Sequence, residues 1–309
     1  MTQKLDINKL QESGSLDLLA RQIVEGYMVG LHKSPYHGFS VEFAEHRLYN
    51  RGESIRHIDW KLFGKTEKLF VKKYEEETNL RCQLVIDISP SMYYPAGDDI
   101  NSSMNKISFS IYSAAALIYL LKKQRDAFGL SFFDDRLQLQ TQNKTNILHQ
   151  RYLYGKLESL LSKQVAKQHK TSTAKVLHEI AELLHQRSMV IIFTDMFSQD
   201  ADTDEIFAAL QHLRHNKHEV ILFHVYDSQL EMSFEFPNRP THFIDTETKE
   251  EIKLSPLEIK REYQSKMQSF KEQIKIKSGQ NKIDIIEADI HKGFYPVLSS
   301  YLLKRSKLY

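Results

Sequence analysis

Asp87, Ser89 and Ser91 place a carboxylate and two hydroxyls at a spacing of two, in a segment suited to a tight turn. This spacing lets the three side-chain oxygens face one point. Asp195, at the end of a second apolar run, and Thr173, before a predicted helix, can add oxygen ligands from neighbouring loops. Oxygens without sulfur or imidazole suit Mg²⁺ or Mn²⁺, held at about 2.0–2.1 Å with a position left for water or a partner. The pattern therefore predicts one divalent-cation site.

The same residues also have an ordinary structural interpretation. Asp87 and Asp195 are suited to cap the helices that follow them, and the serines are common turn residues. The residue types alone leave both interpretations open.

The site residues can meet only if their strands are neighbours in one sheet. Residues 82–86 form an almost unbroken apolar run, typical of a central strand covered on both faces. Strands alternate with helices beyond this run, which predicts an α/β fold with a doubly wound, mostly parallel sheet. Ligands of such sheets gather at the carboxyl ends of the strands, near the topological switch point. The further strands are expected at 128–133, 137–140, 189–194, 219–226 and 282–287, and the helices at about 105–123, 147–162, 174–185, 204–215 and 256–277, with a final helix after the last strand.

The first 80 residues have a different texture. Residues 15–31 show the three- and four-residue apolar spacing of an amphipathic helix. From residue 36 to 80 the pattern changes to short runs such as 40–43 and 69–74, which favours a small β-rich subdomain. We therefore expect an N-terminal helix with this subdomain over residues 1–80 and the α/β domain over residues 81–309.

Composition limits the environment and the partners. The chain has 309 residues, with 42 Lys+Arg against 40 Asp+Glu and a single cysteine, Cys82. The balanced charge gives no global attraction to nucleic acid or to anionic lipid. The one cysteine allows no internal disulfide, which fits a reducing compartment. The longest apolar stretch, between Lys106 and Lys122, is shorter than the roughly 20 residues of a membrane helix, and the N-terminus lacks signal-peptide regions. We expect a cytosolic protein without membrane insertion.

The sequence does not match the signature motifs of several common enzyme classes. Gly64-Lys65-Thr66 imitates the end of a phosphate-binding loop, but Asp59 stands where its first glycine would fall. The chain has no Gly-x-Ser-x-Gly elbow. The spacing of His212, His215 and His218 near a helix end favours a solvated face over a zinc site. The strand-end loops also offer no histidine or lysine beside the Asp87 turn to act as a general base.

Two groups of residues resemble known families. Asp87-x-Ser89-x-Ser91, a downstream threonine and Asp195 resemble the metal-ion-dependent adhesion site of von Willebrand factor A domains. A more selective upstream block resembles the bacterial family catalogued as domain of unknown function 58, in its short form without membrane helices. The resemblance covers nearly the whole chain, and the block includes Gly52-Glu53, Arg56-His57-Ile58-Asp59-Trp60 and Lys72-Lys73-Tyr74-Glu75-Glu76-Glu77.

The resemblance implies a von Willebrand factor A-like α/β domain after a small β-rich region, often encoded beside a MoxR-type AAA+ ATPase. By position it makes Asp87, Ser89 and Ser91 the first-loop ligands of Mg²⁺, Thr173 the second-loop ligand and Asp195 the third. The family commonly has Gly-Gly-Thr-Asp at the second loop, whereas this chain has residues Thr171-Ser172-Thr173-Ala174. The choice among the three hydroxyls therefore stays open.

Two classes of function follow. The favoured one is a non-catalytic adaptor whose metal receives an acidic side chain from a protein partner, most plausibly a MoxR-type ATPase. The alternative is a metal-dependent hydrolase or phosphoryl-transfer enzyme that uses Asp87 and Asp195. A further set of residues in the upstream block could recognise the partner or form an internal salt-bridged network: Arg47, Glu53, Arg56, Asp59 and Trp60.

Overall fold

The apolar run before Asp87 forms strand β3 (Arg81–Asp87), an inner strand of a six-stranded sheet. The strand order is β10-β7-β6-β3-β4-β5. All neighbours are parallel except β5, which pairs antiparallel with β4 at one edge. Along the sequence, β3 takes an inner position and β4 and β5 extend the sheet to one edge. The strands β6, β7 and β10 then extend it from β3 to the other edge, which is the doubly wound order. The predicted fold class is confirmed. The other strands are β4 (Ala127–Phe133), β5 (Leu137–Gln140), β6 (Met189–Thr194), β7 (Glu219–Tyr226) and β10 (Asp284–Asp289).

The computed structural model describes residues 15–32, 46–48, 63–64, 66, 68–72, 80–95, 104–161, 173–196, 200–246 and 249–306. The chain divides into two units, one comprising residues 1–30 and 80–309 and the other residues 31–79. The helix α2 (Leu16–His32) therefore belongs almost entirely to the unit that contains the six-stranded sheet.

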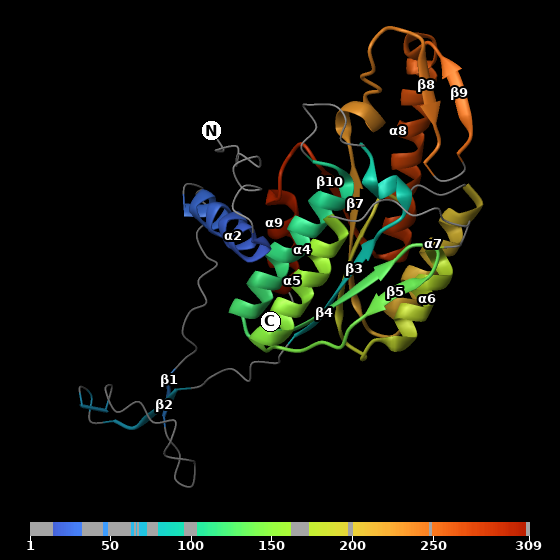
Figure 1. The fold of residues 1–309 in the computed structure, drawn as a ribbon. Coiled ribbons are helices and arrows are strands. Elements are labelled where there is room, and N and C mark those ends of the chain that lie inside the picture. The colour runs from blue at the N-terminus through green and yellow to red at the C-terminus, as the bar shows by residue number, and fades with distance from the viewer. Residues whose placement is uncertain are drawn as a thin grey trace. The chain divides into compact units, whose positions relative to one another are not determined.

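Helices cover both faces of the sheet (Figure 1). One face carries α4 (Lys106–Lys123), α5 (Ile147–Leu161) and α9 (Tyr295–Ser306), and the other carries α6 (Thr173–Leu183), α7 (Asp200–His215) and α8 (Pro256–Asn281). The α2 helix packs on the first layer, where the rings of Tyr27 and Tyr295 lie 5.1 Å apart. Among the described helices, none combines the length and apolarity needed to cross a membrane.

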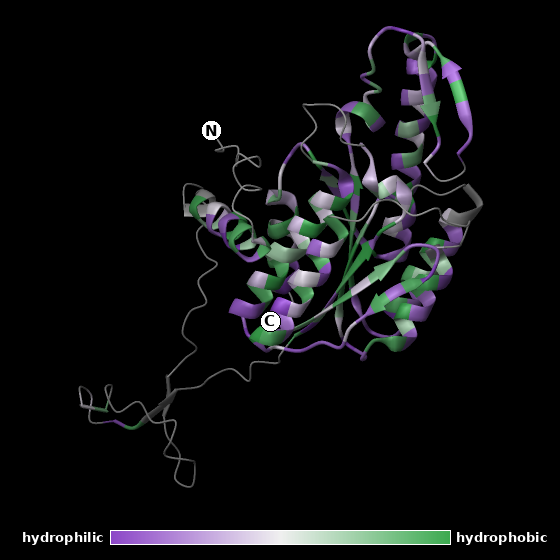
Figure 2. Ribbon diagram, in the orientation of Figure 1, coloured by the Kyte–Doolittle hydropathy of each residue, from purple (hydrophilic) through white to green (hydrophobic). Residues whose placement is uncertain are grey.

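The hydrophobic core follows the strands. Figure 2 shows the inner strands in the green of hydrophobic residues, with purple hydrophilic residues on the helices around them. β6 is buried along its whole length, as expected for a parallel strand covered on both faces. The α4 helix is buried on nearly all sides between the sheet, α5 and α9. This burial brings the polar first residue of α4, Lys106, inside the protein.

The expected elements agree closely with the observed ones, except between β7 and α8. We expected only a polar segment there. The structure instead has a short π-helix, η3 (Ser228–Met232), and an antiparallel hairpin of β8 (Thr241–Ile244) and β9 (Glu251–Leu254). The η3 helix supplies one residue of the site described below.

The second unit contains one described strand pair. β1 (His46–Leu48) pairs antiparallel with β2 (Phe70–Lys72), and Arg47 stands opposite Val71. β2 lies within the strand expected at 69–74, whereas the strand expected at 40–43 lies outside the described residues.

Candidate functional site at the carboxyl edge of the sheet

The switch point of the sheet lies between β3 and β6. These two strands are parallel neighbours, yet the chain leaves them toward opposite edges of the sheet. Asp87 is the last residue of β3, and Asp195 directly follows β6. The fold therefore brings the two predicted carboxylates to the crevice where doubly wound sheets hold their ligands.

Asp87 is buried and hydrogen-bonded through both carboxylate oxygens. Its Oδ1 accepts the backbone N–H of Ser89 at 2.9 Å, and its Oδ2 accepts the hydroxyl of Thr194 at 2.7 Å. Burial, reinforced by the nearby charge of Asp195, raises the pKa of Asp87 to about 7 in spite of these bonds. The negative charge of this carboxylate is thus poorly compensated. The hydrogen bond from the Ser89 N–H is also the bond expected if Asp87 is an ordinary turn residue. Asp87 therefore stabilises the turn as well.

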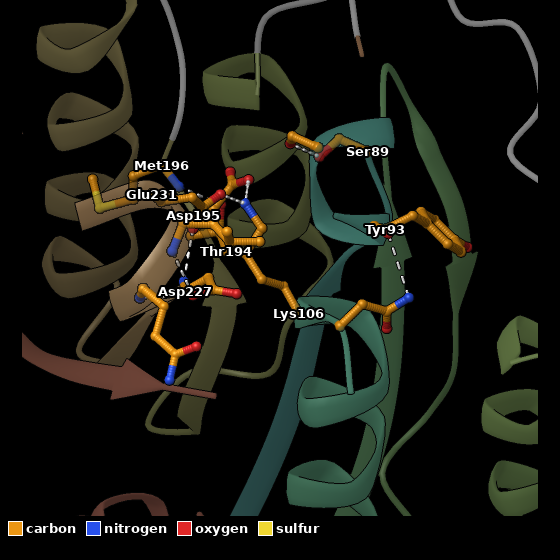
Figure 3. Close-up of polar contacts among 12 residues, drawn as sticks. Ser89, Tyr93, Lys106, Thr194, Asp195, Met196, Asp227 and Glu231 are labelled. Carbon is orange, nitrogen blue, oxygen red and sulfur yellow. Dashed lines mark hydrogen bonds and ion pairs between the residues drawn. The ribbon is translucent and has the colours of Figure 1, made fainter. Parts of the chain in front are cut away.

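Ser89 and Ser91 lie on the turn that follows β3. Pro90 and Ser91 begin a 3₁₀-helix, η2 (Pro90–Tyr93), and Ser89 precedes it without a side-chain capping bond. The two serine Oγ atoms are 3.1 Å apart and both side chains are half-buried (Figure 3). The predicted pair of hydroxyls therefore forms beside Asp87.

A buried lysine also reaches this edge. The Nζ atom of Lys106 lies 2.8 Å from Oδ2 of Asp195 and 2.5 Å from Oε1 of Glu231 (Figure 3). We considered only the strand-end loops, which offer no lysine beside the Asp87 turn, whereas Lys106 comes from the first turn of α4. One signal was present in the sequence. A cation in the first turn of a helix opposes the helix dipole, so it needs an anionic partner elsewhere.

The Lys106 ammonium is a fixed positive charge. Burial alone would lower the pKa of Lys106, but the charges of Asp195 and Glu231 outweigh burial and raise it. A lysine that keeps its proton cannot accept one as a general base.

Glu231 is held in place from the opposite side. Its Oε2 accepts the backbone N–H of Asp227 at 2.7 Å. Asp227 in turn caps η3 by accepting the N–H groups of Gln229 and Leu230, and its Oδ1 lies 2.9 Å from Nε2 of His291. This capped π-helix presents Glu231 to Lys106, a role that the sequence pattern did not reveal.

The donor set fits a hard divalent cation. Asp87 supplies an undercompensated carboxylate, Ser89 and Ser91 supply hydroxyl oxygens, and Asp195 supplies a second carboxylate at the same edge. Mg²⁺ prefers such oxygens and keeps several waters. Within the described ranges no three His, Cys, Asp or Glu residues form a metal-binding group, so the hydroxyls would be essential to the shell.

The remaining predicted site residues are placed only in part. Thr173 is the half-buried first residue of α6, while Thr171 and Ser172 lie outside the described residues. Arg47 lies on β1. The other four residues of the upstream block lie outside the described residues as well: Glu53, Arg56, Asp59 and Trp60.

We expected His212, His215 and His218, near the end of α7, to form one solvated face, but the structure does not place them on one. His215 is exposed, but His218 is buried and its Nδ1 accepts the backbone N–H of Ser188 at 3.2 Å. His212 contacts Glu182 at 2.9 Å. The expectation was wrong for His218 because that residue already leads into the covered strand β7.

The doubly wound sheet, with an Asp-x-Ser-x-Ser turn at its switch point, agrees with the expected von Willebrand factor A-like fold class. The family described as "Protein of unknown function DUF58" matches residues 45–273, which is most of the sequence, and the chain belongs to that family. The resemblance to the domain of unknown function 58 family is thereby confirmed.

Individual relatives and structures are more distant. Uncharacterized proteins of Mycobacterium bovis and Mycobacterium tuberculosis are 25% identical over 136 residues, which cover 44% of this chain and 41% of theirs. The match thus spans about two fifths of these relatives. The crystal structure of the conserved hypothetical protein BatB from Bacteroides thetaiotaomicron has a TM-score of 0.41 and 12% identity, over 72% of this chain and 98% of that one. An uncharacterized membrane-spanning protein from Vibrio fischeri has a TM-score of 0.25 and 14% identity, over 73% and 96%.

Proposed function

We propose that this protein is a non-catalytic interaction module that holds one Mg²⁺ or Mn²⁺ ion at the carboxyl edge of its sheet. The Asp87 carboxylate and the Ser89 and Ser91 hydroxyls would hold the cation, with Asp195 and Thr173 completing the protein's share of the site. An acidic side chain of a protein partner would supply a further ligand.

The observation that carries this proposal is the state of Asp87. A buried carboxylate beside a second one is unfavourable, and the pKa of Asp87, raised to about 7, reflects this. A divalent cation would relieve the repulsion and would also use the adjacent hydroxyl pair. An ordinary turn needs only the bond from Ser89 to Asp87, and it does not need two carboxylates at one edge.

Lys106 supports a binding role over a hydrolytic one. Hydrolysis at a metal site needs a general base or a metal-bound hydroxide with a group to receive its proton. Lys106, at this edge, is ion-paired to Asp195 and Glu231, and its pKa is raised. The metal-dependent hydrolase or phosphoryl-transfer enzyme therefore remains the weaker alternative.

The partner follows from the family resemblance. A MoxR-type AAA+ ATPase is the proposed partner, because members of this family are often encoded beside one. We place the interaction in the cytosol because the single cysteine, Cys82, is buried and can form no internal disulfide.

Titration calorimetry with Mg²⁺ tests the metal site on the full chain. The wild type should bind one ion, and Asp87→Asn should abolish binding while the fold is retained. Asp289→Asn is a matched control, because Asp289 is also a buried strand-end aspartate whose Oδ1 accepts the N–H two residues on, but from the edge strand β10. Wild-type protein that takes up neither Mg²⁺ nor Mn²⁺, or loss of binding in both variants, would contradict the proposal.

Capture of the ATPase tests the partner. Binding of the purified MoxR-type ATPase to the full chain should require Mg²⁺ and should weaken in chelator and in Asp87→Asn. Binding that is unchanged in chelator would indicate a metal-independent scaffold.

A further inference from the structure

Lys106 is a deeply buried charge at the site, with 1% of the residue exposed. Its ammonium joins three segments, since Lys106 begins α4, Asp195 follows β6 and Glu231 lies on η3. Nothing in the proposed metal chemistry uses this lysine. A buried ion pair is weak evidence for stability, because hydrophobic replacement is often neutral or better. Its place beside a candidate metal ligand calls for another explanation.

The charges at this edge do not cancel. Asp87, Asp195 and Glu231 can carry three negative charges, and Lys106 carries one positive charge within 2.8 Å of two of those carboxylates. The ammonium therefore neutralises part of Asp195 and Glu231 and leaves Asp87, whose hydrogen bonds come from Ser89 and Thr194, as the undercompensated carboxylate. An incoming cation would therefore meet one undercompensated carboxylate, Asp87, and a second one, Asp195, that is already paired with the ammonium.

We infer that Lys106 is a resident counter-ion that competes with the divalent cation for Asp195 and so keeps the cation affinity of the isolated chain low. This inference rests on the proposed function. Lys106 is a positioning residue, because it acts on the cation through Asp195. While the ammonium neutralises Asp195, the cation keeps excess positive charge, and a partner's carboxylate would compensate that charge. Partner binding and cation binding would then strengthen each other.

A charge-matched double variant separates this role from a structural one. Lys106→Met with Glu231→Gln removes one positive and one negative charge, so the net charge of the site is unchanged while Asp195 is released. The Glu231→Gln side chain would keep an oxygen to accept the Asp227 N–H that Glu231 accepts now. If Lys106 competes for Asp195, the double variant should bind Mg²⁺ about tenfold more tightly than the wild type in calorimetry, because Asp195 can then bind the cation without competition from the ammonium.

Glu231→Gln alone is the second variant, and it retains the pair between Lys106 and Asp195. It should bind Mg²⁺ more weakly than the wild type, because the whole ammonium charge then falls on Asp195. If the double variant unfolds without cation, its gain in melting temperature on adding Mg²⁺ should exceed that of the wild type.

Two results would overturn the inference: a double variant with unchanged or weaker affinity and no larger gain in melting temperature, or Glu231→Gln binding as tightly as the wild type or more tightly. A purely structural lysine would lower stability in the double variant without raising its cation affinity. Failure of the proposed function has a different signature, which is the absence of Mg²⁺ binding that depends on Asp87. The two failures are thus distinguishable in one set of titrations.

Discussion

The hydroxyl of Thr194 donates to Oδ2 of Asp87 and accepts the backbone N–H of Met196. Because the N–H of Met196 occupies a lone pair of this oxygen, its one proton is directed to Asp87. The bond joins the ends of β6 and β3 at the switch point of the sheet. The chain thus fixes one Asp87 oxygen from the neighbouring strand and the other from the Ser89 turn.

Replacing Asp87 should stabilise the metal-free protein while removing its response to metal. Above pH 7 the buried carboxylate is ionised at a cost, since its folded pKa of about 7 lies above its ordinary value. Asp87→Asn should therefore raise the free energy of unfolding at about pH 8 by about 1–3 kcal/mol. Urea denaturation with and without Mg²⁺ measures both effects, and a variant that is less stable and still responds to Mg²⁺ would refute the assignment.

Truncating Lys106 alone should be severe. Lys106→Met leaves Asp195 and Glu231 buried without their shared cation, which should cost about 3–5 kcal/mol of unfolding free energy. Arg21→Met is the comparison, because Arg21 pairs with Glu25 at 2.7 Å on the exposed side of α2 and should matter little. The measurement is the free energy of unfolding of the two variants by chemical denaturation. A similar decrease in both would show that the buried ion pair contributes no more to stability than the exposed one.

His224 should limit stability in acid. This buried histidine of β7 packs against the rings of Tyr226 and Phe270, its Nε2 has no hydrogen bond within the described residues, and burial lowers its pKa to about 4. The unfolded chain binds this proton more readily, so stability should fall as the pH drops from about 6.5 to 4, by about 3 kcal/mol.

His224→Phe removes that proton and should flatten the fall. The measurement is the unfolding free energy of wild type and variant across this pH range, with the exposed His215→Phe as the control. Parallel curves for the wild type and His224→Phe would exclude His224 as the cause.

Catalytic turnover is expected to be absent. Purified protein with Mg²⁺ or Mn²⁺ should show no phosphatase, nuclease or esterase activity above that of Asp87→Asn, because the lysine at the site keeps its proton. Activity in the wild type that disappears in Asp87→Asn would favour the enzyme alternative.

The sequence predicts the sheet well because its signals are local. The strands expected at 137–140, 189–194 and 219–226 have the observed bounds, since turn residues and changes of apolar period mark their ends. Asp87 and Asp195 come together because parallel neighbours place their carboxyl ends at one edge. These outcomes need only the pattern and the topology that it implies.

The parts that the sequence did not predict depend on distant contacts. No local pattern indicates that Glu231 forms an ion pair with Lys106, because η3 is a single short turn of π-helix in a polar segment. The β8–β9 hairpin is missed for a related reason. Its two strands have only four residues each and contain no buried residue, so their pattern is too short and too exposed to indicate a strand.

The large sequence separation between Lys106 and its two partners has a consequence for the synthesis of the protein. Its two partners lie 89 and 125 residues further along the chain. Contacts of such separation form late, because chain entropy must be lost before they can stabilise the fold. When α4 and β4 have been translated, the nascent chain already contains the Lys106 ammonium, at the start of a helix that will later be buried. Neither carboxylate partner has been made at that stage. Only synthesis through residue 231 supplies both of them, so the carboxyl edge is completed after most of the sheet has been translated.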